Sequence, residues 1–246
     1  LKPFRRAVLA RFITEGRGMM AHGVGSGKTY NQIALAMELR RLGRAKKPLI
    51  VVQGSTINQF AASFKKAYPK ARILVASPKS YSAGARKRFT ARIATGDWDA
   101  IIMTHDNIGQ IPNKPSAIEA YFANEMEELD RALINAEGSD AERDILAARN
   151  KLAEKRIKII QRMTELQDNS IYWENLGVDA LIVDEAHVFK NAPVVTNRGR
   201  EIKNMPTSGD GALRAVSMML KTANVRERGK GKGVFFSPIP ITFIPA

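Results

Sequence analysis

Short runs of apolar residues alternate with helical patterns over the first 110 residues. The strand-like runs lie at residues 19–21, 48–52, 72–76 and 99–103. Between them, apolar side chains recur at helical spacing over residues 29–42, 56–68 and 83–95. Strands that alternate with helices of about ten to fifteen residues indicate βαβ units. We therefore predict an α/β fold, a parallel sheet with helices on both faces.

This alternation stops over residues 115–168, where charge is dense and apolar side chains keep only helical spacing. These side chains are Ile118, Phe122, Met126, Leu129, Leu133, Ile145, Leu152, Ile159, Met163 and Leu166. Gly138 interrupts the pattern, and Ser139 with Glu142 forms a capping box that would start a second helix. We expect an inserted antiparallel hairpin of two long helices, which serves either as a solvated connector or as a functional arm.

The α/β pattern resumes with the apolar run 178–183, a helix over 211–223 and a last run at 234–236. The basic stretch 226–233 is expected to be flexible, and the prolines after it exclude a regular helix or a central strand. The expected division is a first part of the sheet domain at 1–113, the inserted hairpin at 114–170, the second part at 171–236 and an irregular tail at 237–246.

The composition of the chain indicates which kinds of environment and partner it can have. With 44% hydrophobic and 26% charged residues the chain can bury a sizeable core, and no apolar run approaches the ~18 residues of a membrane span. The lack of such a run predicts no membrane partner, while the absence of cysteine excludes disulfides; a cytoplasmic location is expected. A net charge of +15 favours nucleic acid as a partner, although such charge can also serve solubility alone.

A glycine-rich loop follows the first strand-like run. It consists of Gly25, Ser26, Gly27, Lys28 and Thr29. Glycines let successive amides face phosphate oxygens, and the N-terminus of the next helix adds positive dipole. Lys28 can reach the β- and γ-phosphates, and the Thr29 hydroxyl can ligate Mg²⁺. Although a histidine replaces the first glycine of the full phosphate-loop pattern, the strand–loop–helix context predicts a nucleotide site.

Two acidic residues, Asp184 and Glu185, directly follow the run 178–183, and His187 lies just beyond them. Open α/β sheets bind ligands at the carboxyl ends of their strands, so we expect these acids beside the phosphate loop. An aspartate there can hold Mg²⁺, and a glutamate can polarise the attacking water. The two motifs in this order predict ATP and Mg²⁺ as ligands.

These motifs resemble those of the superfamily II helicases. Residues 21–29 resemble helicase motif I and Asp184 to His187 resemble motif II, while the continuation to Lys190 and Asn191 resembles the Swi/Snf branch. Segments 48–60 and 97–102 resemble motif Ia and the strand before motif Ib. The resemblance reaches Phe236 and is most specific to the helicase region of helicase–adenine methylase fusions of phages and mobile elements.

The resemblance implies the RecA-like first lobe of a DNA-dependent ATPase. In that lobe Asp184 would hold the metal, Glu185 would activate water, and His187 would link the site to a second lobe. It also implies that Ser55, Thr104 and His105 lie near the DNA backbone. Contacts would then be made to phosphates, without sequence preference.

Some positions depart from the family pattern. Arg5 stands where these proteins carry a glutamine that reads adenine, and residues 237–240 replace the motif that couples hydrolysis to DNA. No second lobe follows within the chain, so we expect a fragment that lacks the partner arginine. Two alternatives stay open: a different phosphate-loop enzyme, such as a kinase, and a non-catalytic basic DNA-binding or scaffold remnant.

Overall fold

A six-stranded, fully parallel sheet forms the centre of the computed structural model, with strand order β1-β6-β5-β2-β4-β3. The structure describes residues 3–20, 26–78, 80–82, 84–136, 140–167, 171–189 and 210–237. The strands are β1 (Gly18–Met19), β2 (Pro48–Val52), β3 (Ile73–Val75), β4 (Ala100–Thr104), β5 (Ala180–Asp184) and β6 (Val234–Ser237).

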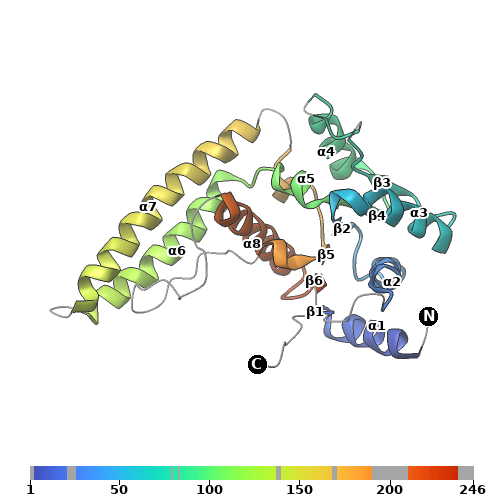
Figure 1. Cartoon of the computed structure of the whole chain (residues 1–246), viewed down its shortest axis with the longest axis horizontal. Helices are drawn as coiled ribbons and strands as arrows, with labels where there is room; N and C mark the ends of the chain where they lie inside the picture. Colours follow the sequence, from blue (N-terminus) through green and yellow to red (C-terminus); the bar gives the residue numbers. More distant parts are fainter. Residues whose placement is uncertain are drawn as a thin grey trace.

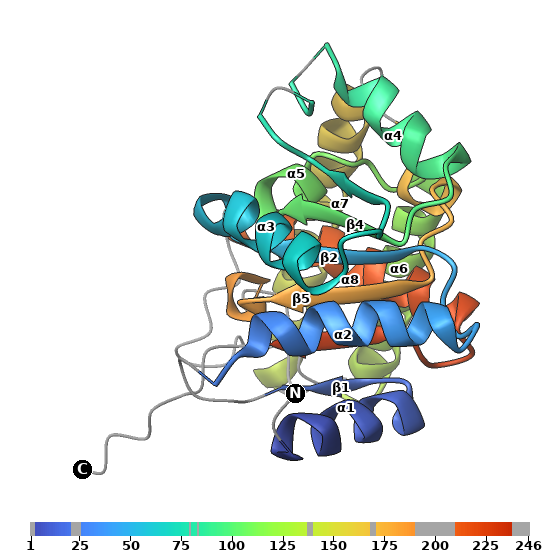
Figure 2. The same ribbon diagram turned by 90° about the vertical axis from the view of Figure 1, so that its right-hand side faces the viewer.

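Helices cover both faces of this sheet, because the central strands are apolar on both sides. One face packs against α1 (Pro3–Glu15), α2 (Lys28–Arg41) and α3 (Ile57–Ala67), which lie in front of the strands in Figure 2. The other face packs against α4 (Arg86–Thr95), α5 (His105–Gly109) and α8 (Asp210–Arg228).

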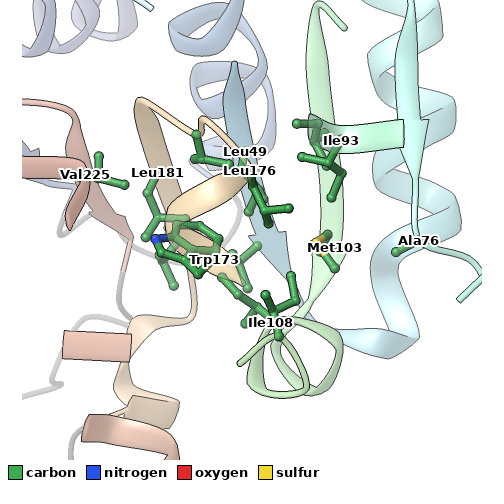
Figure 3. Close-up of a cluster of buried hydrophobic side chains, with 14 of the residues drawn as sticks. Leu49, Ala76, Ile93, Met103, Ile108, Trp173, Leu176, Leu181 and Val225 are labelled. Atoms are coloured by element: carbon green, nitrogen blue, oxygen red, sulfur yellow. The ribbon is translucent and has the colours of Figure 1, made fainter. Parts of the chain in front are cut away.

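Successive side chains of each central strand point to opposite faces of the sheet. In β2, for example, Leu49 and Val51 join the cluster under α4, α5 and α8, whereas Ile50 and Val52 face α2 and α3. Figure 3 shows the first of these clusters, in which Trp173 lies between Leu181 and Ile108. The predicted α/β architecture is confirmed.

The inserted region forms a helical hairpin. Helices α6 (Pro115–Ile134) and α7 (Asp140–Gln167) run side by side and extend away from the sheet (Figure 1). Their apolar side chains form a separate cluster that includes Val216 and Leu220 of α8. Ser139 and Gly138, at the predicted break between the helices, lie outside the described residues.

The segments that flank the hairpin, residues 112–114 and 173–174, lie together at its base, which we call its root. The amide of Trp173 donates to the carbonyl of Pro112 at 2.9 Å, and the Glu174 carboxylate accepts from the amide of Lys114 at 2.8 Å. Asn113 connects this root to α8, because its Oδ1 accepts from the fully buried Lys221 Nζ at 2.9 Å. Burial lowers the pKa of Lys221 to about 7, against a smaller opposing attraction from Glu174.

We predict that residues 115–170 can be replaced by a short Gly/Ser linker without loss of nucleotide binding. The Pro112–Trp173 hydrogen bond already brings the ends together. Since deletion exposes Val216 and Leu220, the variant should also carry Val216→Thr and Leu220→Gln. Titration with a fluorescent ATP analogue checks the result against the intact chain. Loss of soluble, nucleotide-binding protein would show instead that the hairpin belongs to the core of the lobe.

Several local predictions need correction or stay untested. Helix α8 continues to Arg228, so the expectation of a flexible stretch from residue 226 is wrong for its first residues. Helices α1 and α5 were not predicted. Ser237, which was expected to begin the irregular tail, is the last residue of β6, and residues 238–246 lie outside the described part of the chain. Among the residues that the structure describes, no helix has the length and apolar character to cross a membrane.

Candidate nucleotide site

The predicted site residues gather at the carboxyl edge of the sheet. Asp184 ends β5, and Thr104 ends β4 two strands away. Ser237 ends β6 and pairs in register with Asp184. The phosphate loop joins β1 to α2 at the same edge; its residue Gly25 lies outside the described part of the chain. Parallel strands impose this arrangement, because all their carboxyl ends point in one direction.

The described part of the phosphate loop has the backbone expected for anion binding. Gly27 precedes α2 in a left-handed conformation (φ 83°), which glycine adopts without the strain that a side chain brings. Lys28 and Thr29 then form the first turn of α2, where backbone amides lack helical partners. Both side chains are half-buried.

Arg5 of α1 lies against this loop. Its Nε donates to the carbonyl of Ser26 at 2.9 Å, and a Cβ placed on Gly27 would come within 2.2 Å of its guanidinium. A side chain at position 27 would displace the Arg5 guanidinium, and the left-handed backbone would strain it whatever the space. Arg5, which stands where the helicase resemblance predicts a glutamine, thus contacts the backbone of the phosphate loop.

The acidic motif touches the helix that follows the phosphate loop. Gln32 of α2 donates from Nε2 to Asp184 Oδ1 at 2.7 Å, across 152 residues of sequence. Glu185 has a left-handed backbone (φ 49°) and turns the chain out of β5. His187 Nδ1 lies 3.3 Å from Glu185 Oε2, a distance that permits electrostatic attraction although the contact lacks hydrogen-bond geometry.

Buried polar atoms without partners concentrate at this edge. Of ten such side-chain atoms in the described residues, seven belong to the phosphate loop, to α2, to the acidic motif or to the end of β6. They are Ser26 Oγ, Lys28 Nζ, Asn31 Oδ1, Gln32 Oε1, Glu185 Oε2, His187 Nδ1 and Ser237 Oγ. Native proteins seldom bury polar groups without partners, so the cluster indicates a polar ligand.

The three residues predicted to lie near DNA differ in exposure. Ser55 is exposed in the 3₁₀ turn η1 (Gly54–Thr56) after β2. Thr104 is buried, and its hydroxyl accepts from the amide of Asn107 to cap α5. His105 is 6% exposed and bonds to the backbone of Asp184. Among the three, the side chain of Ser55 alone is accessible to a partner.

Sequence reasoning missed one residue of the site and gave another a different role. Gln32 is fully buried and donates to Asp184, and no pattern in the sequence separates it from the other polar residues of α2. His105 was noticed but assigned to DNA. Among the described residues, no three His, Asp or Glu side chains form a metal-binding group by themselves.

The chain is similar in sequence to a described family and to a phage protein. Residues 11–241 match a family described as "Probable helicase domain". The chain is 22% identical to the "Defense against restriction protein B" of Escherichia phage P1, in an alignment that covers 98% of the chain and 12% of that protein. The chain therefore spans 12% of the length of this relative.

The fold is also similar to a Sulfolobus solfataricus SWI2/SNF2 ATPase core in complex with dsDNA. The TM-score is 0.45 at 12% sequence identity, over 98% of this chain and 32% of that one. The family match is the more informative comparison, because it includes both the described phosphate-loop residues and the acidic motif. Since it covers residues 11–241, the chain belongs to the family of probable helicase domains.

Proposed function

We propose that this chain is the ATP·Mg²⁺-binding lobe of a DNA-dependent helicase or translocase ATPase. The observation that carries the proposal is Lys28, whose Nζ is buried at the first turn of α2 without a hydrogen-bond partner among the described residues. A buried ammonium group is unfavourable unless it meets an anion. The phosphate chain of a nucleotide is the anion that a phosphate loop presents to such a lysine.

The roles follow from the positions of the side chains. Lys28 would contact the β- and γ-phosphates, while Thr29 and Asp184 would hold Mg²⁺. When bound, Mg²⁺ supplies positive charge against the phosphate oxygens. Glu185 would take the proton of the attacking water, and its turned-out backbone places it beyond the end of β5. His187 Nδ1 lies 3.3 Å from Glu185 Oε2, next to this carboxylate.

The finer assignment is to the Swi/Snf branch of superfamily II, acting with a second lobe in a longer protein. It rests on His187 and on Lys190 and Asn191, the last two outside the described residues. An origin in a helicase–adenine methylase fusion belongs to the same proposal and rests on sequence resemblance alone.

The distribution of charge supports DNA binding by the sheet domain. Residues 114–170 contain nine basic and twelve acidic residues, so the hairpin region is net acidic. The rest of the chain contains thirty basic and twelve acidic residues, a net charge of +18. Backbone phosphates of DNA would therefore be attracted to the sheet domain and not to the hairpin.

The nucleotide part of the proposal is tested by titrating the chain with a fluorescent ATP analogue, with and without Mg²⁺. Saturable binding that Mg²⁺ strengthens is expected. An absence of binding under both conditions would refute the proposal and leave the non-catalytic, basic DNA-binding interpretation.

DNA affinity is expected to fall steeply with salt and to be equal for duplexes of unrelated sequence. Phosphate contacts release counterions, so affinity should drop at least ~10-fold between about 50 and 200 mM salt. Fluorescence anisotropy with two labelled duplexes measures this. The hairpin-deletion variant is the matched control and should keep its affinity. Salt-insensitive or sequence-dependent binding would contradict a phosphate-based interface.

A further inference from the structure

His105 connects two strands that are not neighbours in the sheet. It is the first residue of α5, directly after β4, and its Nε2 lies 2.7 Å from the carbonyl oxygen of Asp184 at the end of β5. Strand β2 separates β4 from β5, so the imidazole bridges the end of β2. Capping of α5 by the Thr104 hydroxyl fixes the backbone from which the ring projects.

The direction of this hydrogen bond follows from the chemistry of its acceptor. A carbonyl oxygen only accepts hydrogen bonds, so His105 Nε2 carries the proton and donates it. Burial lowers the pKa of His105, against smaller opposing effects of Asp184 and Asp106. The ring also meets Phe189 edge-on, at 5.5 Å between centroids. His105 therefore contacts both ends of the segment 184–189.

The carbonyl that His105 holds belongs to the peptide that precedes Glu185. Glu185 has φ 49°, a backbone conformation that L residues rarely adopt. The register between β2 and β5 ends at Val51 and Val183, so β2 does not pair with this peptide. The imidazole occupies the position that a strand partner would take, and it fixes the peptide plane from which the Glu185 side chain departs.

We propose that His105 is a positioning residue for the acidic motif: it holds the Asp184–Glu185 peptide so that the Glu185 carboxylate is aimed at the attacking water. This role rests on the proposed function of the site. It replaces the DNA contact that the sequence predicted for His105. The neighbouring residue, Asp106 of α5, forms an exposed ion pair with Arg214 of α8 at 3.0 Å.

Two substitutions separate the hydrogen bond from the ring. His105→Gln keeps an N–H donor near the position of Nε2, whereas His105→Phe keeps a ring against Phe189 without a donor. Hydrolysis is measured with the chain in excess over labelled ATP, which resolves slow rates. His105→Phe should lower the rate constant about tenfold or more with an unchanged dissociation constant for the ATP analogue. His105→Gln should restore most of the rate. Equal rates for His105→Phe and the wild type would overturn the proposal.

A second measurement needs no nucleotide. Hydrogen exchange of the amides of residues 185–189 should be about tenfold faster in His105→Phe, and close to wild type in His105→Gln. Unchanged exchange in His105→Phe would overturn the positioning role, even if the wild-type chain failed to bind ATP and the proposed function fell with it. If His105→Phe instead weakened DNA binding alone, with exchange and hydrolysis unchanged, His105 would be a DNA contact and the proposal would be wrong.

Discussion

Replacement of Lys28 by alanine is expected to remove nearly all nucleotide binding while leaving the fold intact. Hydrogen bonds to charged groups contribute about 1.5–3 kcal/mol each, and the Lys28 ammonium can donate up to three. The affinity for an ATP analogue should therefore fall about a hundredfold or more. Because Lys28 Nζ makes no hydrogen bond within the described part of the chain, its removal costs the native state little.

Fluorescence titration of Lys28→Ala measures this loss, and its thermal unfolding is compared with that of the wild type. Lys87→Ala is the matched control, since Lys87 is exposed on α4 in the cluster of helices on the opposite face of the sheet from α2. That variant should bind nucleotide like the wild type. An unchanged affinity in Lys28→Ala would remove the phosphate-loop assignment, whatever the behaviour of the control.

The 246-residue chain by itself is expected to bind ATP·Mg²⁺ but to hydrolyse it slowly, with or without DNA. In related phosphate-loop systems an arginine that stabilises the transferring phosphoryl group is worth about 10³–10⁵ in rate. The helicase resemblance implies that this arginine comes from a second lobe. Within the described residues, Arg5 contacts the phosphate loop, but its Nε is bonded to the carbonyl of Ser26.

A steady-state phosphate-release assay decides this point, with Glu185→Gln as the baseline for turnover that does not depend on the site. The wild-type rate should be low both with and without duplex DNA, and Glu185→Gln should lower it further because it removes the base that takes the proton of the attacking water. Robust DNA-stimulated turnover that Glu185→Gln abolishes would contradict the prediction. Arg5→Ala would then show whether Arg5 supplies the missing charge. Transfer of the phosphoryl group to an acceptor other than water would favour the kinase alternative.

The sequence by itself determined the elements of the sheet and the position of the two motifs. Continuous apolar runs such as residues 48–52 and 180–183 indicate strands that are buried on both faces. Once those strands are parallel, Lys28 and Asp184 must share the carboxyl edge. The helical hairpin could also be predicted from the sequence, because its apolar side chains keep helical spacing over many turns.

Short or weakly amphipathic helices could not be predicted from the sequence. Helix α1 has no clear apolar stripe, and α5 is too short for periodicity to show. Their formation depends on long-range contacts: Phe12 of α1 packs on Phe235 of β6, and Thr104 caps α5. Such contacts join segments that are far apart in sequence, so no local pattern encodes them.

The tertiary structure alone decided the strand order and, through it, the side chains that surround the acids. Placement of β2 between β4 and β5 lets His105 reach the Asp184 carbonyl, and α2 packs so that Gln32 reaches the Asp184 carboxylate. The sequence pattern of a histidine directly after a strand is the same whether its ring faces DNA or a buried carbonyl. Only the packing of neighbouring strands distinguishes them, because burial removes the ring from solvent and leaves the carbonyl as its partner.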